Sequence, residues 1–206
     1  MLVVGAVLIS LTWFQLWPIK MTEVLGFVTG GICGWLIVRE DMLNWPIGLA
    51  NFLFFAVLFY NAGLYADMAV QVIFFCFSLY GWWAWLRGSS GDKPLAITRT
   101  KFGEWITLAI VLPVAFCGMV VFLKYIHDAA PTWDGVTAIL SLTAQFLLCQ
   151  KRLENWYFWI AAQSIYIPLY FYRELPLTAI LYVMFLIMCV IGLVTWRKKW
   201  KEAQAV

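Results

Sequence analysis

Residues 44–87 read NWPIGLANFLFFAVLFYNAGLYADMAVQVIFFCFSLYGWWAWLR, and residues 155–198 read NWYFWIAAQSIYIPLYFYRELPLTAILYVMFLIMCVIGLVTWRK. The second stretch repeats the pattern of the first without a gap. The shared landmarks are an Asn-Trp opening, a Leu at the middle turn and a Gly–Trp close: Asn44 and Asn155, Trp45 and Trp156, Leu64 and Leu175, Gly81 and Gly192, Trp85 and Trp196. Chance similarity between apolar segments is the alternative, but ungapped landmarks favour duplication. A duplicated block of membrane helices is an architecture of transporters, whose site forms where the repeats meet.

The composition indicates an integral membrane protein. Of the 206 residues, 64% are hydrophobic and 12% are charged, and the mean hydropathy is +0.85. Soluble domains carry about twice that fraction of charge. No phosphate-binding GxxxxGK[ST] motif is present, which argues against a self-contained ATP-driven pump. The cysteines lie in apolar runs, none in a CxxC motif, so we expect no disulfide framework, metal site or cofactor. We expect membrane lipid as a partner and no nucleic acid.

Seven apolar stretches have the length of a membrane-spanning helix, which is about 20 residues. They are 22–38, 43–60, 64–87, 102–125, 133–149, 156–172 and 175–196. Residues 1–19 form a further N-terminal apolar segment, read as an extra helix. It could lie in the interface, span the membrane or be an uncleaved signal, and the lack of a basic start and of an AxA site argues against a cleaved signal peptide.

These stretches predict an all-α membrane protein with a seven-helix core arranged 3+1+3. Residues 22–87 form the first three-helix repeat and residues 133–198 the second. Residues 88–132 hold a loop and the linker helix, and residues 199–206 are a tail. Because three spans invert the direction of the chain, a fourth is needed to restore it. The two repeats are therefore expected to be parallel, related by an axis along the membrane normal.

The basic residues predict the orientation. Of the fourteen Lys and Arg residues, only Lys20, Lys124 and Arg173 fall on one side of this layout, and the other eleven fall on the opposite side. The positive-inside bias then places the C-terminus, and the tail at 199–206, in the cytoplasm.

Polar and aromatic residues recur at helical spacing, which predicts one inward stripe on each of four helices. The candidate substrate-binding residues on these stripes are Trp45, Asn51, Gln71, Phe74, Ser78, Trp82, Trp156, Trp159, Gln163, Tyr166 and Tyr182. The alternative is that the aromatic rings only pack and the amides only join helices. Asn51, Gln71, Gln145 and Gln163 favour a site, because amides at membrane depth are costly without partners. Asn44 and Asn155 each precede a helix and are expected to be N-caps.

Ionisable residues fall at or beyond the ends of the apolar stretches, with Asp67 the deepest acid. Proton relays and ion-coupled carriers usually need such groups within the membrane, so this distribution favours facilitated diffusion. No catalytic residue is predicted, since HExxH, GxSxG and a carboxylate pair in the apolar zone are all missing from the sequence.

The stretches NWPIG and FAVLFYNAGLYADMAVQVIFFCFSLYGWWAWLRG resemble the signature of the bacterial PnuC-type nicotinamide riboside transporters, and NWYFWI with IPLYFYRELPLTAILYVMFLIMCVIGLVTWRK is similar to that family's second repeat. The resemblance covers roughly residues 22–199. It implies a SWEET-like fold, a homotrimer and energy-independent vitamin uptake across the inner membrane. It also implies that a cytoplasmic riboside kinase traps the substrate by phosphorylation.

The predicted stripes suit nicotinamide riboside. Its pyridinium ring is a cation that Trp and Tyr faces attract, by about 2 kcal/mol each at best. Amide side chains match its carboxamide and hydroxyls. Two other functions stay open: a thiamine or riboflavin carrier of the same architecture, and a membrane receptor that binds a small molecule without moving it.

Overall fold

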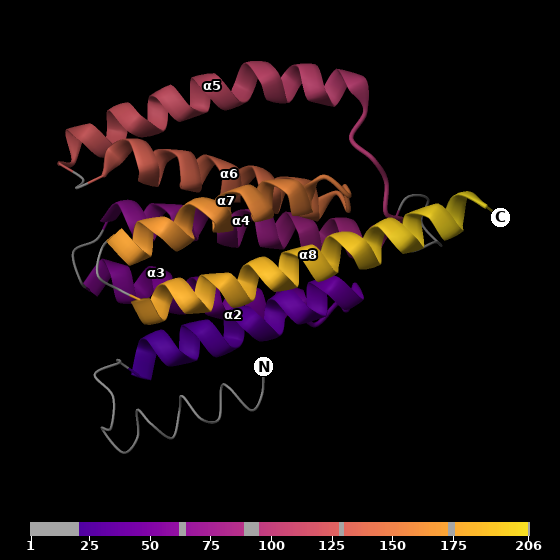
Figure 1. The fold of residues 1–206 in the computed structure, drawn as a ribbon, viewed down its shortest axis with the longest axis horizontal. Helices are drawn as coiled ribbons and strands as arrows, with labels where there is room; N and C mark the ends of the chain where they lie inside the picture. The colour runs from indigo at the N-terminus through magenta and orange to yellow at the C-terminus, as the bar shows by residue number, and fades with distance from the viewer. Residues whose placement is uncertain (1–20, 62–64, 89–94, 128–129, 173–175, 206) are drawn as a thin grey trace. The chain divides into compact units, whose positions relative to one another are not determined.

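The structure, a computed structural model, describes residues 21–61, 65–88, 95–127, 130–172 and 176–205. Within these ranges the chain forms seven helices, labelled in Figure 1: α2 (Met21–Arg39), α3 (Asn44–Asn61), α4 (Tyr65–Arg87), α5 (Phe102–Tyr125), α6 (Pro131–Cys149), α7 (Asn155–Tyr172) and α8 (Pro176–Gln204). The predicted all-helical fold and its seven helices are confirmed. The N-terminal segment 1–19 lies outside the described residues.

Three segments among the described residues are long and apolar enough to cross a membrane. They are Met68–Arg87 in α4, Phe102–Tyr125 and Pro131–Cys149. A shorter apolar segment, Val28–Arg39, lies in α2. This pattern is that of a multi-pass membrane protein.

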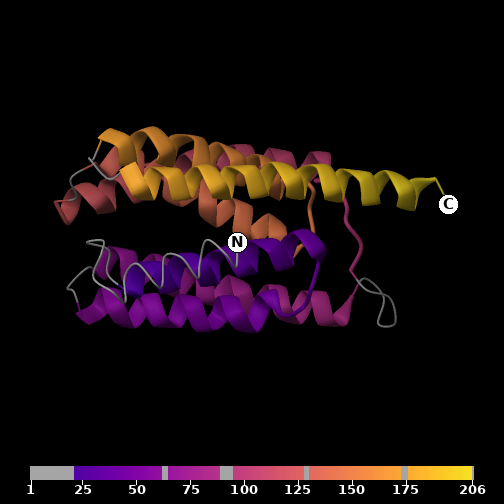
Figure 2. The same ribbon diagram turned by 60° about the horizontal axis from the view of Figure 1, so that its bottom comes forward.

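The chain divides into two compact units, Met1–Phe75 and Cys76–Val206, with the boundary inside α4. In the first unit, α2 packs along α3 (Figure 2). The Asn51 amide donates a hydrogen bond to the Thr29 hydroxyl, which in turn donates to the Gly26 carbonyl at 3.1 Å. A Cβ on Gly26 would lie 1.9 Å from the Phe55 ring, so the glycine allows α2 and α3 to approach closely.

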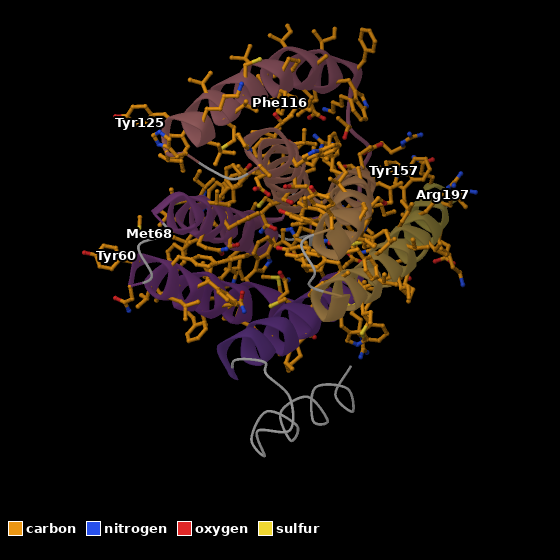
Figure 3. All side chains as sticks on the ribbon, turned by 60° about the vertical axis from the view of Figure 1, so that its left-hand side comes forward. Tyr60, Met68, Phe116, Tyr125, Tyr157 and Arg197 are labelled. Atoms are coloured by element: carbon orange, nitrogen blue, oxygen red, sulfur yellow. The ribbon has the colours of Figure 1, made fainter. Side chains whose placement is uncertain are left out.

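In the second unit, α6 packs against both α5 and α7, and α7 packs against α8 (Figure 1). Phe116 of α5 reaches toward Gly135 of α6, where it would lie 3.6 Å from an added Cβ (Figure 3). The opposite face of α5 is exposed and apolar, with Val114 69% exposed. Half of α6 is buried, and its buried side chains include hydroxyls and an amide. Polar groups thus gather on the enclosed helix and apolar groups on the outer one, as expected in lipid.

The connection that precedes α5 is hydrogen-bonded to the turn between α6 and α7. Thr98 and Arg152 form an isolated parallel β-bridge. The Glu154 carboxylate is 1% exposed and accepts hydrogen bonds from the Thr100 N–H at 2.8 Å, the Thr100 hydroxyl at 2.9 Å and Arg99 Nε at 3.0 Å. We call this cluster the Glu154 clasp. It lies outside the three membrane-spanning segments.

The backbone of each unit carries the signature of the sequence repeat. Helix α3 spans Asn44–Asn61 and α7 spans Asn155–Tyr172, which are matching positions of the two repeats. The turns that precede them also match: Glu40 and Lys151 hold equivalent positions, and both have positive φ, 61° and 49°. Such a conformation is uncommon outside glycine. The same unusual backbone conformation at the same repeat position is evidence for duplication in addition to the matching residues.

The prediction that Asn155 is an N-cap is wrong. Its Nδ2 donates to the Arg152 carbonyl at 2.6 Å, and its buried Oδ1 accepts no hydrogen bond within the described part of the chain. A capping side chain would instead accept from a backbone N–H in the first turn. Asn44 makes the equivalent bond, from Nδ2 to the Asp41 carbonyl at 2.6 Å. Both asparagines therefore close the turn behind them.

Candidate functional site

Three tyrosine rings from α7 and α8 form a cluster in the second unit. The ring centroids of Tyr166 and Tyr182 are 4.8 Å apart, those of Tyr170 and Tyr182 are 4.9 Å apart, and those of Tyr166 and Tyr170 are 6.0 Å apart. Phe185 meets Tyr182 edge to face, with centroids 6.1 Å apart. Tyr166 and Tyr170 share a face because they are four residues apart on α7. We call Tyr166, Tyr170 and Tyr182 the tyrosine cluster.

Helix α6 lines this cluster with hydroxyl groups. The Tyr166 hydroxyl lies near the Thr137 and Ser141 hydroxyls. Thr137 donates its own proton to the Trp133 carbonyl at 3.0 Å, which leaves its oxygen able to accept. Thr137 and Ser141 are four residues apart on α6 and are 1% and 5% exposed. The polar face of α6 and the aromatic face of α7 therefore meet.

Gln163 lies one turn before Tyr166 on the same face of α7. Its side chain is buried, at 7% exposure, and its Oε1 has no hydrogen-bond partner among the described residues. Gln145 of α6 differs, because its Nε2 donates to the Ser78 hydroxyl at 3.1 Å. Of these two predicted inward amides, one joins helices and the other keeps an unused acceptor.

Trp156 lies elsewhere, in a second aromatic cluster at the start of α7. Its ring meets the Trp196 ring edge to face, with centroids 5.4 Å apart, and lies against Gly192. Trp85 lies 6.3 Å from Trp196, and the Lys151 ammonium lies 4.2 Å above the Trp85 ring. Trp156 is 4% exposed, so here it acts as a packed core residue. No substrate contact by Trp156 is tested, and that role stays a prediction.

The other candidates of the second unit are Ser78, Trp82 and Trp159. Ser78 is 1% exposed and is held by the bond from Gln145. Trp82 and Trp159 are partly buried. The structure therefore brings together Gln163, Tyr166 and Tyr182, and it places Ser78 in a helix-joining contact.

The candidates of the first unit are Trp45, Asn51, Gln71 and Phe74. Trp45 is buried, and Asn51 is bound to Thr29. Phe74 stacks on Phe52, with centroids 5.3 Å apart and planes 12° apart. Gln71 resembles Gln163, because its buried Oε1 lacks a partner among the described residues. That these four residues and those of the second unit serve one site stays a prediction.

Sequence reasoning did not include Thr137 and Ser141 in the candidate site. The signal was present, because Thr137, Ser141 and Gln145 recur every four residues and so share one face of α6. Small hydroxyl residues in membrane helices more commonly serve in helix packing, so residue type alone does not mark them as site residues. Tyr170, four residues after Tyr166, is also missing from the predicted site residues.

Rings and amides of this kind can bind a flat polar ligand. Tyrosine faces attract a cation and stack on a ring, and the hydroxyls and the free amide oxygen offer hydrogen bonds. The described residues include no group of three or more His, Cys, Asp or Glu side chains placed to hold a metal ion.

The chain is similar to known transporters. Residues 20–198 match the family described as nicotinamide mononucleotide transporter. The chain is 27% identical to the nicotinamide riboside transporter PnuC of Escherichia coli, over 75% of each chain. It is 27% identical to the PnuC protein of Neisseria mucosa, over 83% of this chain and 70% of that one.

Two further likenesses bear on fold and substrate. The chain is 22% identical to the riboflavin/roseoflavin transporter RibM of Streptomyces davaonensis, over 88% of this chain and 84% of that one. It also superposes on a crystal structure of the vitamin B3 transporter PnuC with a TM-score of 0.76, at 23% identity, over 97% of this chain and 88% of that one. The last likeness shows that the fold is shared. Because the family match extends over nearly the whole described chain, the protein belongs to the nicotinamide mononucleotide transporter family.

Proposed function

We propose that this protein carries nicotinamide riboside across the bacterial inner membrane by facilitated diffusion. The observation that carries the proposal is the tyrosine cluster on the helix face of Gln163, whose buried Oε1 has no partner among the described residues, in a chain of this family. The pyridinium ring of nicotinamide riboside is a flat cation, and its carboxamide and ribose are hydrogen-bonding groups. Aromatic faces and an amide are the groups that such a ligand needs.

We propose the 3+1+3 arrangement as the frame of transport. The matching bounds of α3 and α7 and the matching turns before them support two equivalent three-helix blocks. Helix α5 is then the linker that lets both blocks run in the same direction. Carriers built from parallel repeats rock one block against the other around a central site.

Passive movement follows from the distribution of charge in the sequence. Ionisable residues fall at or beyond the ends of the apolar stretches, whereas ion-coupled carriers usually hold such groups within the membrane. Net uptake in the cell then needs a trap, and we propose phosphorylation by a cytoplasmic riboside kinase. We further propose that the working form is a homotrimer, as the family resemblance implies.

The test is uptake of labelled nicotinamide riboside by proteoliposomes that hold the purified full chain. We expect uptake that stops when the internal and external concentrations are equal, and competition by nicotinamide riboside at lower concentrations than thiamine or riboflavin. Binding without uptake would instead support a receptor. Accumulation driven by an imposed sodium or proton gradient would contradict passive transport and would make Asp67 the first residue to examine.

A riboflavin carrier is the second candidate, because the chain is also similar to RibM. The same competition experiment separates the two. Stronger competition by riboflavin than by nicotinamide riboside would favour this second function.

A further inference from the structure

Gln163 carries a hydrogen-bond acceptor that no described residue uses. Its side chain is 7% exposed, and Oε1 has no hydrogen-bond partner in the described part of the chain. A buried carbonyl oxygen without a partner is destabilising, so an unsatisfied group of this kind calls for an explanation.

Gln163 Oε1 lies in a different part of α7 from the other buried side-chain atoms of the second unit that have no partner among the described residues. The others, Arg152 Nε, Asn155 Oδ1 and Trp156 Nε1, belong to the turn before α7 or to its first residues. Gln163 lies two turns further along α7, and its face of the helix continues into Tyr166 and Tyr170. The unused oxygen therefore belongs to the helix face that carries two of the three tyrosines.

The groups around that cluster differ from Gln163 in hydrogen-bonding character. The Thr137, Ser141 and Tyr166 hydroxyls can each donate or accept a hydrogen bond. An amide oxygen can only accept. A ligand that rests on the tyrosine rings and satisfies Gln163 must therefore present an N–H or O–H group to it.

We propose that Gln163 Oε1 accepts a hydrogen bond from the carboxamide N–H₂ of the substrate, and that this contact makes the carrier select carboxamide pyridinium nucleosides over their carboxylate analogues. The inference rests on the proposed function. In the acid analogue the N–H₂ is replaced by an ionised oxygen, which has no proton to donate and repels the Gln163 oxygen. A site built to bond a substrate N–H rejects analogues that lack it, because its own polar group is left unpaired.

The experiment compares nicotinamide riboside with nicotinic acid riboside as competitors for labelled nicotinamide riboside, using the full chain in proteoliposomes. We expect the wild type to prefer the amide by about tenfold or more. Gln163→Met keeps the length of the side chain and removes both polar atoms, so the preference should fall close to one. Gln163→Glu keeps acceptor oxygens, loses the N–H₂ and adds a negative charge that repels the acid analogue, so the preference should persist or widen.

Gln145→Met is the matched control, because Gln145 is a buried glutamine on the neighbouring helix with a structural partner, Ser78. We expect it to lower the melting temperature while leaving the amide-to-acid ratio unchanged. A Gln163→Met ratio equal to that of the wild type would overturn the inference, and so would loss of the preference in Gln163→Glu. A wild type that transports both ribosides equally would refute this inference alone, whereas a wild type that transports neither would refute the proposed function.

Discussion

The Trp156 ring lies directly on Gly192, and a Cβ built on that glycine would be 2.4 Å from the ring. The contact joins the start of α7 to α8, and the same ring meets Trp196 edge to face. Glycine allows this close approach, which is a common way for membrane helices to pack. Both residues recur in the first repeat as Trp45 and Gly81, so the landmarks that reveal the duplication include a packing pair.

Gly192→Ala should therefore destabilise the protein. The added methyl group overlaps a ring that is itself 4% exposed and cannot easily move, and overpacking of this kind costs about 1–3 kcal/mol. The measurement is the melting temperature in detergent. Gly118→Ala in α5 is the matched control, because nothing lies within 4 Å of its added Cβ, and it should be neutral or slightly stabilising. An equal fall in melting temperature for both variants would mean that the contact with Trp156 does not explain the effect of a larger side chain at position 192.

Apolar length and helical spacing were sufficient to predict the helices. The predicted stretch 102–125 coincides with α5, and the three-residue spacing of Gln163 and Tyr166 places them on one face of α7. The predicted end of the last helix, 196, was too early, because α8 continues to Gln204. The apolar stretch ends at the first basic residues, but the helix continues beyond them because Lys, Glu and Ala are good helix formers in water.

The Glu154 clasp could not be predicted from the sequence. Its partners come from two connections that are distant in sequence, and neither connection has a period that marks it. The sequence also could not predict that Gln163 Oε1 has no hydrogen-bond partner among the described residues. Gln145 and Gln163 look alike as polar residues in apolar helices, and only the packing of α4 on α6 supplies Ser78 to one of them.

Glu154 should make the stability of the fold depend on acidity. Burial alone would raise the pKa of its carboxyl, but hydrogen bonds from the Thr100 N–H, Arg99 and the Thr100 hydroxyl outweigh burial and hold the pKa below its usual value. The group is then more acidic in the folded chain than in the unfolded one. Its contribution is present above the unfolded pKa, near 4.5, and is lost as the pH falls through the lower folded value.

The measurement is the melting temperature in detergent between roughly pH 3 and pH 7. We expect Glu154→Gln to melt lower than the wild type at neutral pH, with a difference that shrinks as the pH falls. Glu202→Gln is the control, since the Glu202 side chain is 62% exposed and its ion pair with Lys198 spans 3.9 Å. A wild-type difference between pH 3 and pH 7 that survives in Glu154→Gln would show that other groups cause it.

Tyr182 should contribute to ligand affinity through its ring. Its centroid lies within 5 Å of both Tyr166 and Tyr170, so its removal opens the centre of the tyrosine cluster. Tyr182→Leu should weaken binding of nicotinamide riboside by roughly ten- to thirtyfold, as expected for loss of one cation–π contact of up to about 2 kcal/mol. Tyr182→Phe keeps the ring and should cost much less.

Isothermal titration with the purified protein measures both effects. Tyr157→Leu is the control, because Tyr157 is an α7 tyrosine that is 44% exposed and does not belong to the tyrosine cluster. If Tyr182→Phe proved as damaging as Tyr182→Leu, the hydroxyl and not the ring would be the important group.

The C-terminus should lie in the cytoplasm. Helix α8 ends in the run Arg197, Lys198, Lys199 and Lys201, and basic residues near the end of a span are retained on the cytoplasmic side. The Glu154 clasp adds two more exposed or partly exposed cations, Arg99 and Arg152, and Arg99 lies 5.7 Å from the Trp200 ring of α8. The basic end of α8 and the basic connection before α5 are thus on the same side of the second unit.

A fluorescent reporter that matures only in the cytoplasm should be active when fused after Val206, and alkaline phosphatase, which needs the periplasm, should be inactive there. The opposite pair of activities would reverse every span, and it would place the Glu154 clasp on the periplasmic face, where the pH dependence predicted above would respond to the external medium.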